Sequence, residues 1–437
     1  MEYWVEGVTH RGEGVIHMEG KVCFVPWALP GELIAAEVTQ SKKSYARGRL
    51  GAIIEASPQR AEPWCPLFYA CGGCVWQHVT YAQQLAYKRQ TVAEQLRRIA
   101  HIEAEVAPVI GMENPRHYRN KVTWQVGRGK DDVGLGFFRA DSHEMLPFCA
   151  CGIIPPLMNE IGGWLNERVS VAGLGGGDQV VLRQSNVDGS LLLLLPREPS
   201  DGDFLPALRA RFPEIASVCV MDGGKLRAVF GPGWQLQALA GCRYRIGATG
   251  FLQVNSVQAD KLYAVILSMV GEGASFDILE AYCGSGTISC MLARAGHRVC
   301  GVEYNAAAVA DADFNVALNG LAPECCIFYC GACEDLLSGI RNPWRAADAK
   351  GAPGGFDVVI LDPPRAGCHP ASLEAITDQA PPRIIYVSCD PATLARDLAR
   401  FCAAGYQVDA VQPVDMFPHT AHVETVVALE QTRDSKI

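Results

Sequence analysis

Cys389 has the type and position of a residue that could carry out covalent chemistry. It follows the apolar run 383–387, which predicts a buried parallel strand. Asp390 and Pro391 then predict a helix start, because aspartate caps helices and proline suits their first turn. Open α/β sheets place active sites at such strand ends, and a helix N-terminus lowers a thiol pKa, which favours the thiolate. The alternative is that Cys389 is a small buried apolar side chain, as most of the 18 cysteines must be.

Three cysteines within ten residues form a second candidate site. Cys65, Cys71 and Cys74 are close in sequence, and the two glycines before Cys74 allow a tight turn, so the thiols could surround one metal centre. Zinc or an iron–sulfur cluster needs a fourth ligand, for which Cys149 and Cys151 are the candidates. Structural zinc usually binds paired Cys-x2-Cys motifs. The spacing therefore favours a 4Fe–4S cluster over zinc, and free thiols are the remaining alternative.

The stretch 276–287 predicts a crevice for a nucleoside cofactor. It reads as a strand, a turn with Gly284 and Gly286, and the start of a helix. Glu303 ends the next strand, at a position where an acid can hold ribose hydroxyls. Dinucleotide-binding loops usually have a third glycine, and residues 287–289 contain none. S-adenosylmethionine is therefore favoured over NAD.

These residues require a doubly wound α/β sheet to position them. Residues 248–437 alternate strand and helix patterns, which predicts a Rossmann-like domain. Strands are expected at 276–281, 298–303, 357–361 and 383–388. Asp362 follows the third of these, and the two prolines after it make a rigid ledge at the edge where Cys389 is expected.

Two other segments precede this domain. Residues 1–57 alternate short strand-like runs with glycine turns, which predicts a small OB-like β-barrel of a kind that often binds RNA. Residues 58–247 predict a mixed α/β central domain that carries the metal cluster, with a strand at 190–195. A helix from Tyr81 to about Ile99 is expected to have one basic face. The stretch 342–355, rich in Gly, Ala and Pro, predicts a loop.

Composition and charge narrow the class of protein. With 437 residues, 49% hydrophobic and 19% charged, the chain reads as an ordinary globular protein without a membrane span or signal peptide, in a reducing cytoplasm. The net charge of −9 argues weakly against nucleic acid. Basic residues nevertheless gather at 42–49 and 81–130, and a local basic face can bind phosphates. Either cluster alone reads more simply as solvated surface.

Together the motifs resemble the uracil-C5 RNA methyltransferases. The resemblance extends over nearly the whole chain and is strongest in three motifs: 362–365, 388–397 and 422–424. Residues 251–255 are similar to the family's cofactor-contacting segment, and residues 118–121 to its central-domain motif. The first 57 residues resemble a TRAM domain, in the motifs 12–15, 25–26 and 29–32. The TRAM domain with the cysteines is more similar to the 23S rRNA branch than to the generally shorter tRNA branch.

The resemblance implies roles for individual residues. It implies that Cys389 is the nucleophile and Glu424 the base. The residues that match the family's cofactor positions are Gln253, Tyr282, Glu303 and Asp362. The residues that match its cluster ligands are Cys65, Cys71, Cys74 and Cys151. Cys151 is preferred to Cys149 because its spacing to a following Pro-Pro pair and to Asn159 fits the family.

Two positions depart from the family pattern. Asp390 stands where the family usually has Asn, and Glu280 where it usually has Asp. A negative charge beside Cys389 raises the pKa of its thiol, against the effect of the helix terminus. Glu280 keeps the charge but changes its reach, so both departures bear on rate more than on reaction type.

The implied reaction explains why a thiol and a carboxylate are the minimum set. C5 of uracil is a poor nucleophile until a thiolate adds at C6, and a base must then remove the C5 proton. The expected function is S-adenosylmethionine-dependent methylation of uracil C5 in RNA, in 23S rRNA rather than tRNA, by a monomer acting on an exposed or flipped-out base.

Two alternatives belong to other classes. Asp362 and the two prolines after it are similar to a motif of amino-group methyltransferases, but those enzymes need an aromatic residue where Arg365 stands, and no thiol. A non-catalytic RNA-binding iron–sulfur protein is the second alternative. Cofactor binding would separate it from either enzyme.

Overall fold

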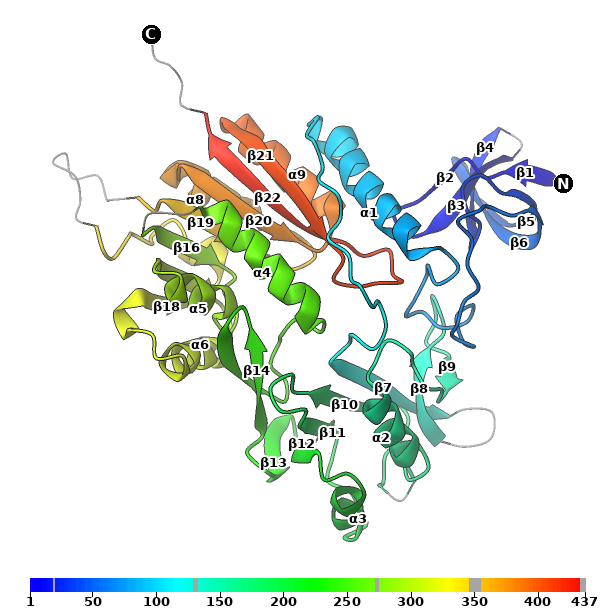
Figure 1. Ribbon diagram of the computed structural model, residues 1–437, viewed down its shortest axis with the longest axis horizontal. Helices are drawn as coiled ribbons and strands as arrows, with labels where there is room; N and C mark the ends of the chain where they lie inside the picture. Colours follow the sequence, from blue (N-terminus) through cyan, green and yellow to red (C-terminus); the bar gives the residue numbers. More distant parts are fainter. Residues whose placement is uncertain (19, 129–132, 171, 272–274, 346–354, 433–437) are drawn as a thin grey trace.

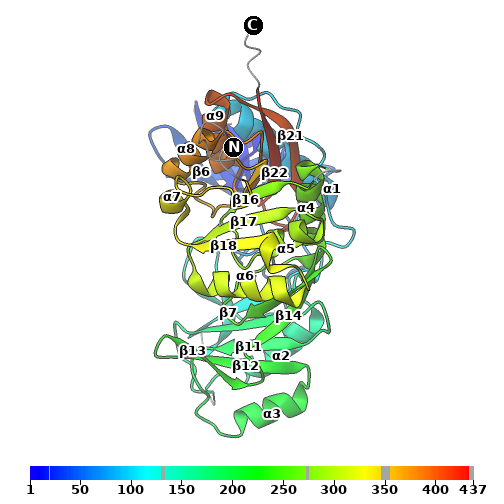
Figure 2. The same ribbon diagram turned by 90° about the vertical axis from the view of Figure 1, so that its left-hand side faces the viewer.

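The three large β-sheets follow one another along the chain. The computed structural model describes all residues except 19, 129–132, 171, 272–274, 346–354 and 433–437. In Figure 1 the first sheet lies at one end, the central sheet lies below, and the C-terminal sheet, yellow-green to red, lies above. Figure 2 shows the C-terminal sheet above the central one from the side. No helix in the described part of the chain is both long and apolar enough to cross a membrane.

The first sheet is the predicted N-terminal β-domain. Its order is β1-β5-β6-β4-β3-β2. The strands are β1 (Glu2–Trp4), β2 (Gly7–Val8), β3 (Glu13–Met18), β4 (Lys21–Pro26), β5 (Leu33–Ser41) and β6 (Tyr45–Glu55). Alternate residues such as Ile16, Val25 and Ile34 point into one apolar core, as period-two strands require. The short strands that the sequence predicts within residues 1–57 are confirmed.

The central sheet has the order β13-β12-β11-β10-β7-β8-β9. Its strands are β7 (Lys121–Arg128), β8 (Val133–Phe138), β9 (Met145–Pro147), β10 (Gln179–Gln184), β11 (Leu191–Leu195), β12 (Ile215–Asp222) and β13 (Lys225–Phe230), and its helices are α2 (Pro156–Asn166) and α3 (Phe204–Arg211). β11 is the strand predicted at 190–195, and all five of its leucines are buried because both faces of the strand are covered. A hairpin of β14 (Trp234–Leu239) and β15 (Cys242–Gly247) then leads to the last domain.

The C-terminal sheet is doubly wound, with the order β18-β17-β16-β19-β20-β22-β21. Its parallel strands are β16 (Asp277–Ala281), β17 (Arg298–Glu303), β18 (Cys326–Cys330), β19 (Val358–Leu361) and β20 (Arg383–Ser388). β21 (Tyr406–Val414) and β22 (Glu424–Gln431) are antiparallel and complete one edge. The four strands predicted here are confirmed to within a residue. The order reverses between β16 and β19, which makes their carboxyl ends the expected ligand crevice.

Helices cover both faces of this sheet. One face packs against α4 (Ser256–Val270), α5 (Thr287–Arg294) and α6 (Ala306–Leu318). The other packs against α7 (Cys333–Leu336), α8 (Pro370–Gln379) and α9 (Pro391–Ala403). Of the loop predicted at 342–355, residues 346–354 lie outside the described residues, and the others form no helix or strand.

The predicted helix at 81–99 exists but packs on the C-terminal sheet. It consists of α1 (Tyr81–Gln95) and a π-helical turn η1 (Leu96–Ala100), and Figure 1 shows α1 beside β21 and α9. Its apolar residues Val92 and Leu96 join the core under α8 and α9, and isolated bridges at Val106–Val411 and Ile110–Val414 extend the sheet edge. The division at 57 and 247 stays a prediction, and residues 81–110 share a core with the last domain.

The predicted basic face of this helix is wrong at one position. Lys88 is fully buried and forms an ion pair with Asp415, which is also fully buried. A buried lysine needs such a partner, because an unpaired charge in the interior costs several kcal/mol, about 3–5 when one member of a buried pair is removed. Arg89, one residue along, is exposed.

Candidate active site

Cys389 lies at the carboxyl end of β20, where the sequence predicts it. The next residue, Asp390, caps α9: its Oδ1 accepts from the backbone N–H groups of Ala392 and Thr393, each at 3.0 Å. The hydroxyl of Ser388 accepts from the Asp390 N–H at 3.2 Å. The backbone on both sides of Cys389 is therefore fixed, and its half-buried side chain is held at the strand tip.

Burial and nearby charged side chains set the pKa of the Cys389 thiol. Burial and then the charge of Glu424 raise the pKa of Cys389 to about 11, whereas the Arg365 guanidinium lowers it. The pKa of Cys389 is therefore raised, whereas the sequence predicted a lowered value from the helix N-terminus; burial and the nearby acids are the causes. Asp390 also raises the pKa, in the direction that the sequence predicted for its negative charge.

Glu424 is brought next to Cys389 by the register of two strands. β20 and β22 pair Ser388 with Thr425, so the next residues at this end of the ladder are Cys389 and Glu424. Glu424 is the first residue of β22. It is 4% exposed, and in the part of the chain that the structure describes its carboxylate accepts no hydrogen bond. Burial and then the charge of Asp362 raise the pKa of Glu424 to about 8.

Acidic side chains form a row along the carboxyl edge of the sheet. Asp362 directly follows β19, and burial raises its pKa to about 7. Glu280, in β16, has a pKa raised to about 8 by burial and by the charges of Asp362 and Glu303, and it accepts a hydrogen bond from Ser289. We call Glu303, Glu280, Asp362 and Glu424 the acid row. Since the raised pKa values of Glu280, Asp362 and Glu424 lie near neutrality, these three groups are suited to moving protons.

Glu303 differs from the rest of the acid row in its hydrogen bonds. Its Oε2 accepts from the N–H of Gly284 at 3.1 Å, and its Oε1 from the N–H of Asn305 at 2.8 Å. Gly286, which begins α5, has φ +72°, and a Cβ there would lie 2.9 Å from the Cβ of Ala312. The predicted glycine turn is therefore needed both for its backbone conformation and for close packing.

The structure places the other two predicted cofactor residues as follows. Tyr282 follows β16 with φ +66°, a strained conformation for a residue with a side chain, and its hydroxyl donates to Ser372 Oγ at 3.4 Å. Gln253 precedes α4, and its carbonyl accepts from Asn120 Nδ2 at 3.3 Å. The cofactor roles of Tyr282 and Gln253 stay predictions.

The predicted cluster cysteines lie close to one another. Burial, then the charges of Cys151, Cys71 and Cys65, raise the pKa of Cys74 to about 12, partly offset by a hydrogen bond from Gln77. Cys149 is close enough to act on Cys71 in the same way. Among the described residues, however, no three His, Cys, Asp or Glu side chains are arranged to hold a metal ion. The choice of the fourth ligand and the metal itself stay predictions.

Sequence reasoning missed the polar residues that tie α1 to the loop before Glu424. Gln84 and Lys88 are buried and four residues apart, in line with the apolar Val92. Polar residues on a stripe that should be apolar are the available signal. Their partners, Asp415 and His419, are far away in the sequence.

Two family models match this chain. One, tRNA (Uracil-5-)-methyltransferase, covers residues 238–432, and the other, the TRAM domain, covers residues 4–50. Uncharacterized RNA methyltransferases of Halalkalibacterium halodurans and Thermosynechococcus vestitus are 36% and 35% identical to the chain. Each alignment spans 98% of this chain, with 96% and 97% of the relatives. The chain belongs to the RNA uracil-C5 methyltransferase family.

A solved structure supports this membership at the level of the whole molecule. The Pyrococcus abyssi tRNA (uracil-54, C5)-methyltransferase, in complex with S-adenosyl-L-homocysteine, matches with a TM-score of 0.76 at 26% identity. The match covers 98% of this chain and 100% of that one. As a uracil-C5 family RNA methyltransferase, the protein uses S-adenosylmethionine, and it carries a TRAM domain ahead of a Rossmann-like domain.

Proposed function

We propose that this enzyme methylates C5 of a uracil in RNA with Cys389 as nucleophile and Glu424 as base. The observation that carries the proposal is the β20–β22 register, which makes these two residues neighbours at the end of the ladder. The pKa values support separate roles for the two residues. The pKa of the Cys389 thiol is raised to about 11, and the pKa of the Glu424 carboxyl is raised to about 8. A carboxylate whose pKa lies near neutrality both accepts and releases a proton readily.

The chemistry proceeds in two stages on the protein's own residues. The Cys389 thiolate, favoured by the nearby Arg365 charge, forms a bond to C6 and moves the electrons of the C5–C6 double bond into an enolate. S-adenosylmethionine, when bound, supplies the activated methyl group that C5 takes. Glu424 then accepts the C5 proton, the electron pair restores the double bond, and Cys389 leaves as a thiolate.

We propose the cofactor-binding residues from their places at the carboxyl edge of the sheet and before α4. We assign Glu303 to the ribose hydroxyls, because each of its oxygens already accepts one backbone N–H and keeps a lone pair free. Asp362, Tyr282 and Gln253 complete the proposed site, at the strand ends and before α4.

The cysteines fit an iron–sulfur cluster by donor chemistry. Cys65, Cys71, Cys74 and Cys151 offer four thiols, and the N–H of Gly73 already points at the Sγ of Cys71, 3.4 Å away. Amide donors to sulfur are typical of such clusters. The backbone of Cys151 is also fixed, since its N–H donates to Asn159 Oδ1 at 2.7 Å and its carbonyl accepts from Asn159 Nδ2 at 3.0 Å.

Iron content tests the cluster directly. Protein purified without oxygen should be brown, with about four irons per chain, and Cys151→Ser should lose more iron than Cys149→Ser. If the protein instead contains stoichiometric zinc and shows no visible absorption, the site binds zinc and the iron–sulfur proposal is wrong. If Cys149→Ser loses more iron than Cys151→Ser, the fourth ligand is Cys149.

We propose 23S rRNA as the substrate, acted on by a cytoplasmic monomer. The TRAM domain together with the grouped cysteines supports this choice. Transfer RNA is the second candidate, because the Pyrococcus abyssi relative, named for tRNA, matches over its whole length. Mapping 5-methyluridine in both RNAs from a strain that lacks the gene distinguishes them: the RNA that loses the mark, and that the pure enzyme remethylates, is the substrate.

The catalytic roles are tested by trapping the covalent intermediate. Cys389→Ala should neither methylate RNA nor form an adduct, whereas Glu424→Gln should accumulate a protein–RNA band on a denaturing gel. RNA that contains 5-fluorouracil should trap the wild-type enzyme, since fluorine cannot leave as a cation. An adduct formed by Cys389→Ala would mean that another nucleophile is at work.

A further inference from the structure

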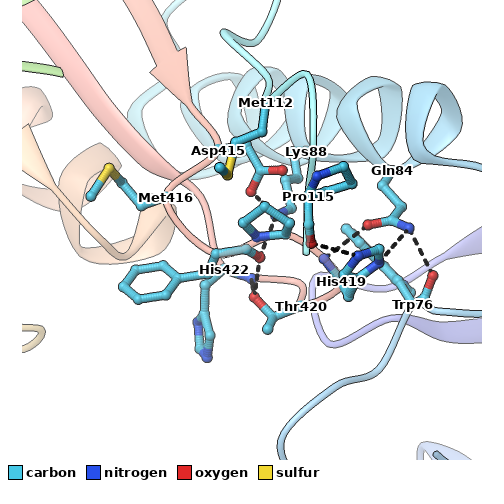
Figure 3. Close-up of polar contacts among 12 residues, drawn as sticks. Trp76, Gln84, Lys88, Met112, Pro115, Asp415, Met416, His419, Thr420 and His422 are labelled. Carbon is cyan, nitrogen blue, oxygen red and sulfur yellow. Dashed lines mark hydrogen bonds and ion pairs between the residues drawn. The ribbon is translucent and has the colours of Figure 1, made fainter. Parts of the chain in front are cut away.

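The loop between β21 and β22, residues 415–423, ends at the proposed base. Val414, just before the loop, pairs in the sheet with Glu424, just after it. Both ends of the loop therefore lie at Glu424. Figure 3 shows residues of this loop beside the polar side chains of Gln84 and Lys88 from α1, and near Trp76 and Pro115. The position of Glu424 therefore depends on how the loop is held.

Lys88 holds the first part of the loop. Its Nζ lies 2.5 Å from Asp415 Oδ1 and donates to the carbonyl of Phe417 at 3.0 Å. The hydroxyl of Tyr81, also on α1, donates to Asp415 Oδ2 at 2.7 Å. Both members of the Lys88–Asp415 pair are completely buried. Charged hydrogen bonds in an interior are strong and directional, so they fix where the loop leaves β21.

Gln84 holds the middle of the loop, one turn earlier on α1. Its Oε1 accepts from the backbone N–H of His419 at 3.0 Å, and its Nε2 lies 3.3 Å from His419 Nδ1. His419 has φ +67°, and its Nε2 faces the carbonyl of Pro115 at 3.0 Å. Burial lowers the pKa of His419 to about 4. The ring is therefore neutral, and this network assigns its proton to Nε2, where it donates to Pro115.

The same histidine ties the loop to the cysteine-rich segment. The N–H groups of Val75 and Trp76, directly after Cys74, donate to the carbonyl of His419 at 2.9 and 3.0 Å. Gln84 Nε2 in turn donates to the carbonyl of Trp76 at 2.9 Å. Loop 415–423 thus receives contacts from α1 and from Val75 and Trp76, the residues that directly follow Cys74 (Figure 3).

We propose that Gln84 and Lys88 are positioning residues that hold loop 415–423 and thereby place the Glu424 carboxylate for proton removal. The inference rests on the proposed role of Glu424. A buried ion pair is a poor way to gain stability, because well-packed apolar residues would serve as well or better. Gln84 and Lys88 both contact loop 415–423, and this loop leads directly to Glu424, whose position matters for proton removal.

Gln84→Leu is the variant that tests the holding of the loop. It keeps the bulk of the side chain but removes its bonds to His419 and Trp76, and hydrogen exchange of the amides at 416–423 should rise at least tenfold. Gln90→Leu is the matched control, because Gln90 is an exposed residue of the same helix. Unchanged exchange in Gln84→Leu, or an equal rise in both variants, would overturn the inference, whatever Glu424 does.

Adduct formation tests the consequence for catalysis. Gln84→Leu should bind RNA and S-adenosylmethionine, turn over at least tenfold more slowly, and accumulate the same protein–RNA adduct as Glu424→Gln. Slow turnover without the adduct, while Glu424→Gln accumulates it, would place the loop in another step and refute the inference alone. If Glu424→Gln forms no adduct, the proposed base is wrong and the inference falls with it.

Lys88→Met provides an independent variant. This variant retains the apolar stem of the side chain but removes the hydrogen bonds to Asp415 and Phe417. It should raise the hydrogen exchange of the loop amides and the amount of protein–RNA adduct, as Gln84→Leu does. Circular dichroism establishes whether either variant is folded. If Gln84→Leu does not fold, Lys88→Met decides, and wild-type exchange with wild-type turnover in that variant overturns the inference.

Discussion

Glu303 and Glu424 are two glutamates at the same edge of one sheet, and their surroundings differ in kind. Glu303 accepts a backbone N–H on each oxygen, from Gly284 and from Asn305. The carboxylate of Glu424 accepts no hydrogen bond within the described part of the chain, and its pKa is raised to about 8. Amide donors stabilise a fixed negative charge, whereas burial without donors favours a group that gains and loses a proton. The same side chain is thus suited to binding in one place and to proton transfer in the other.

The largest expected effect comes from removing the proton acceptor. Glu424→Gln should lower turnover by about 10²–10⁴-fold, the usual contribution of a general base, and should leave S-adenosylmethionine affinity within about twofold of wild type, since a neutral isostere keeps the crevice's shape. Single-turnover kinetics and calorimetry measure the two quantities. A large loss of cofactor affinity would mean that Glu424 acts like Glu303 and would break the comparison.

The complementary change is expected to act on binding. Glu303→Ala should weaken S-adenosylmethionine binding by about 10–100-fold, because charged hydrogen bonds are worth about 1.5–3 kcal/mol, and should leave RNA binding unchanged. Calorimetry with cofactor and filter binding with RNA provide the measurement. Wild-type cofactor affinity in this variant would remove Glu303 from the site.

A third effect should appear in stability. The pKa of Glu424 is raised from 4.5 to about 8 in the folded protein, so the unfolded chain ionises first as pH rises through this window, and the folded state loses stability there. The Glu424→Gln variant does not lose stability in this way, because its side chain does not ionise. Its apparent melting temperature should exceed that of wild type by a few degrees near pH 8.5 and match it near pH 4.5. Glu303→Gln is the control and should show no such gain, because its amide nitrogen cannot accept and one of the two backbone N–H groups loses its acceptor.

The smallest expected effect concerns Asp390. Its charge is one of several that raise the pKa of Cys389. Asp390→Asn should therefore lower that pKa and move the rising limb of the pH–rate profile to lower pH by less than about one unit. Asn also caps helices well, so α9 stays intact. Asp409→Asn, an equal charge change at an exposed site on β21, should leave the profile in place.

The parts of the fold that the sequence predicted are those set by local patterns. The parallel strands are short apolar runs, and the start of α9 follows from Asp390 and Pro391, which is why both were confirmed. The pKa of Cys389 was predicted in the wrong direction, because it is raised by burial and then by the charges of Glu424 and Asp362, which come from distant parts of the chain. Long-range pairing, unlike helix capping, leaves no local signal.

Lys88 illustrates the same limit in the fold. A lysine followed by Arg89 and Gln90 reads as surface, and the pairing with Asp415 makes its burial possible. The early segment around α1 was therefore expected to belong with the central residues, although its core lies with the last strands. Cys65, Cys71 and Cys74, in contrast, were expected near one another from their spacing, and the structure brings them close.

The packing of α1 has a consequence for the order in which the protein is made. Asp415 is synthesised 327 residues after Lys88, a delay of roughly 15–65 s at about 5–20 residues per second. During that time Val92 and Leu96 lack the strands and helices that will bury them. The other side of α1 is covered early, since Tyr87 packs with Leu29 and Trp76. The nascent helix is therefore anchored to the first domain while one face stays exposed, and the last strands of the chain complete a core that its first hundred residues began.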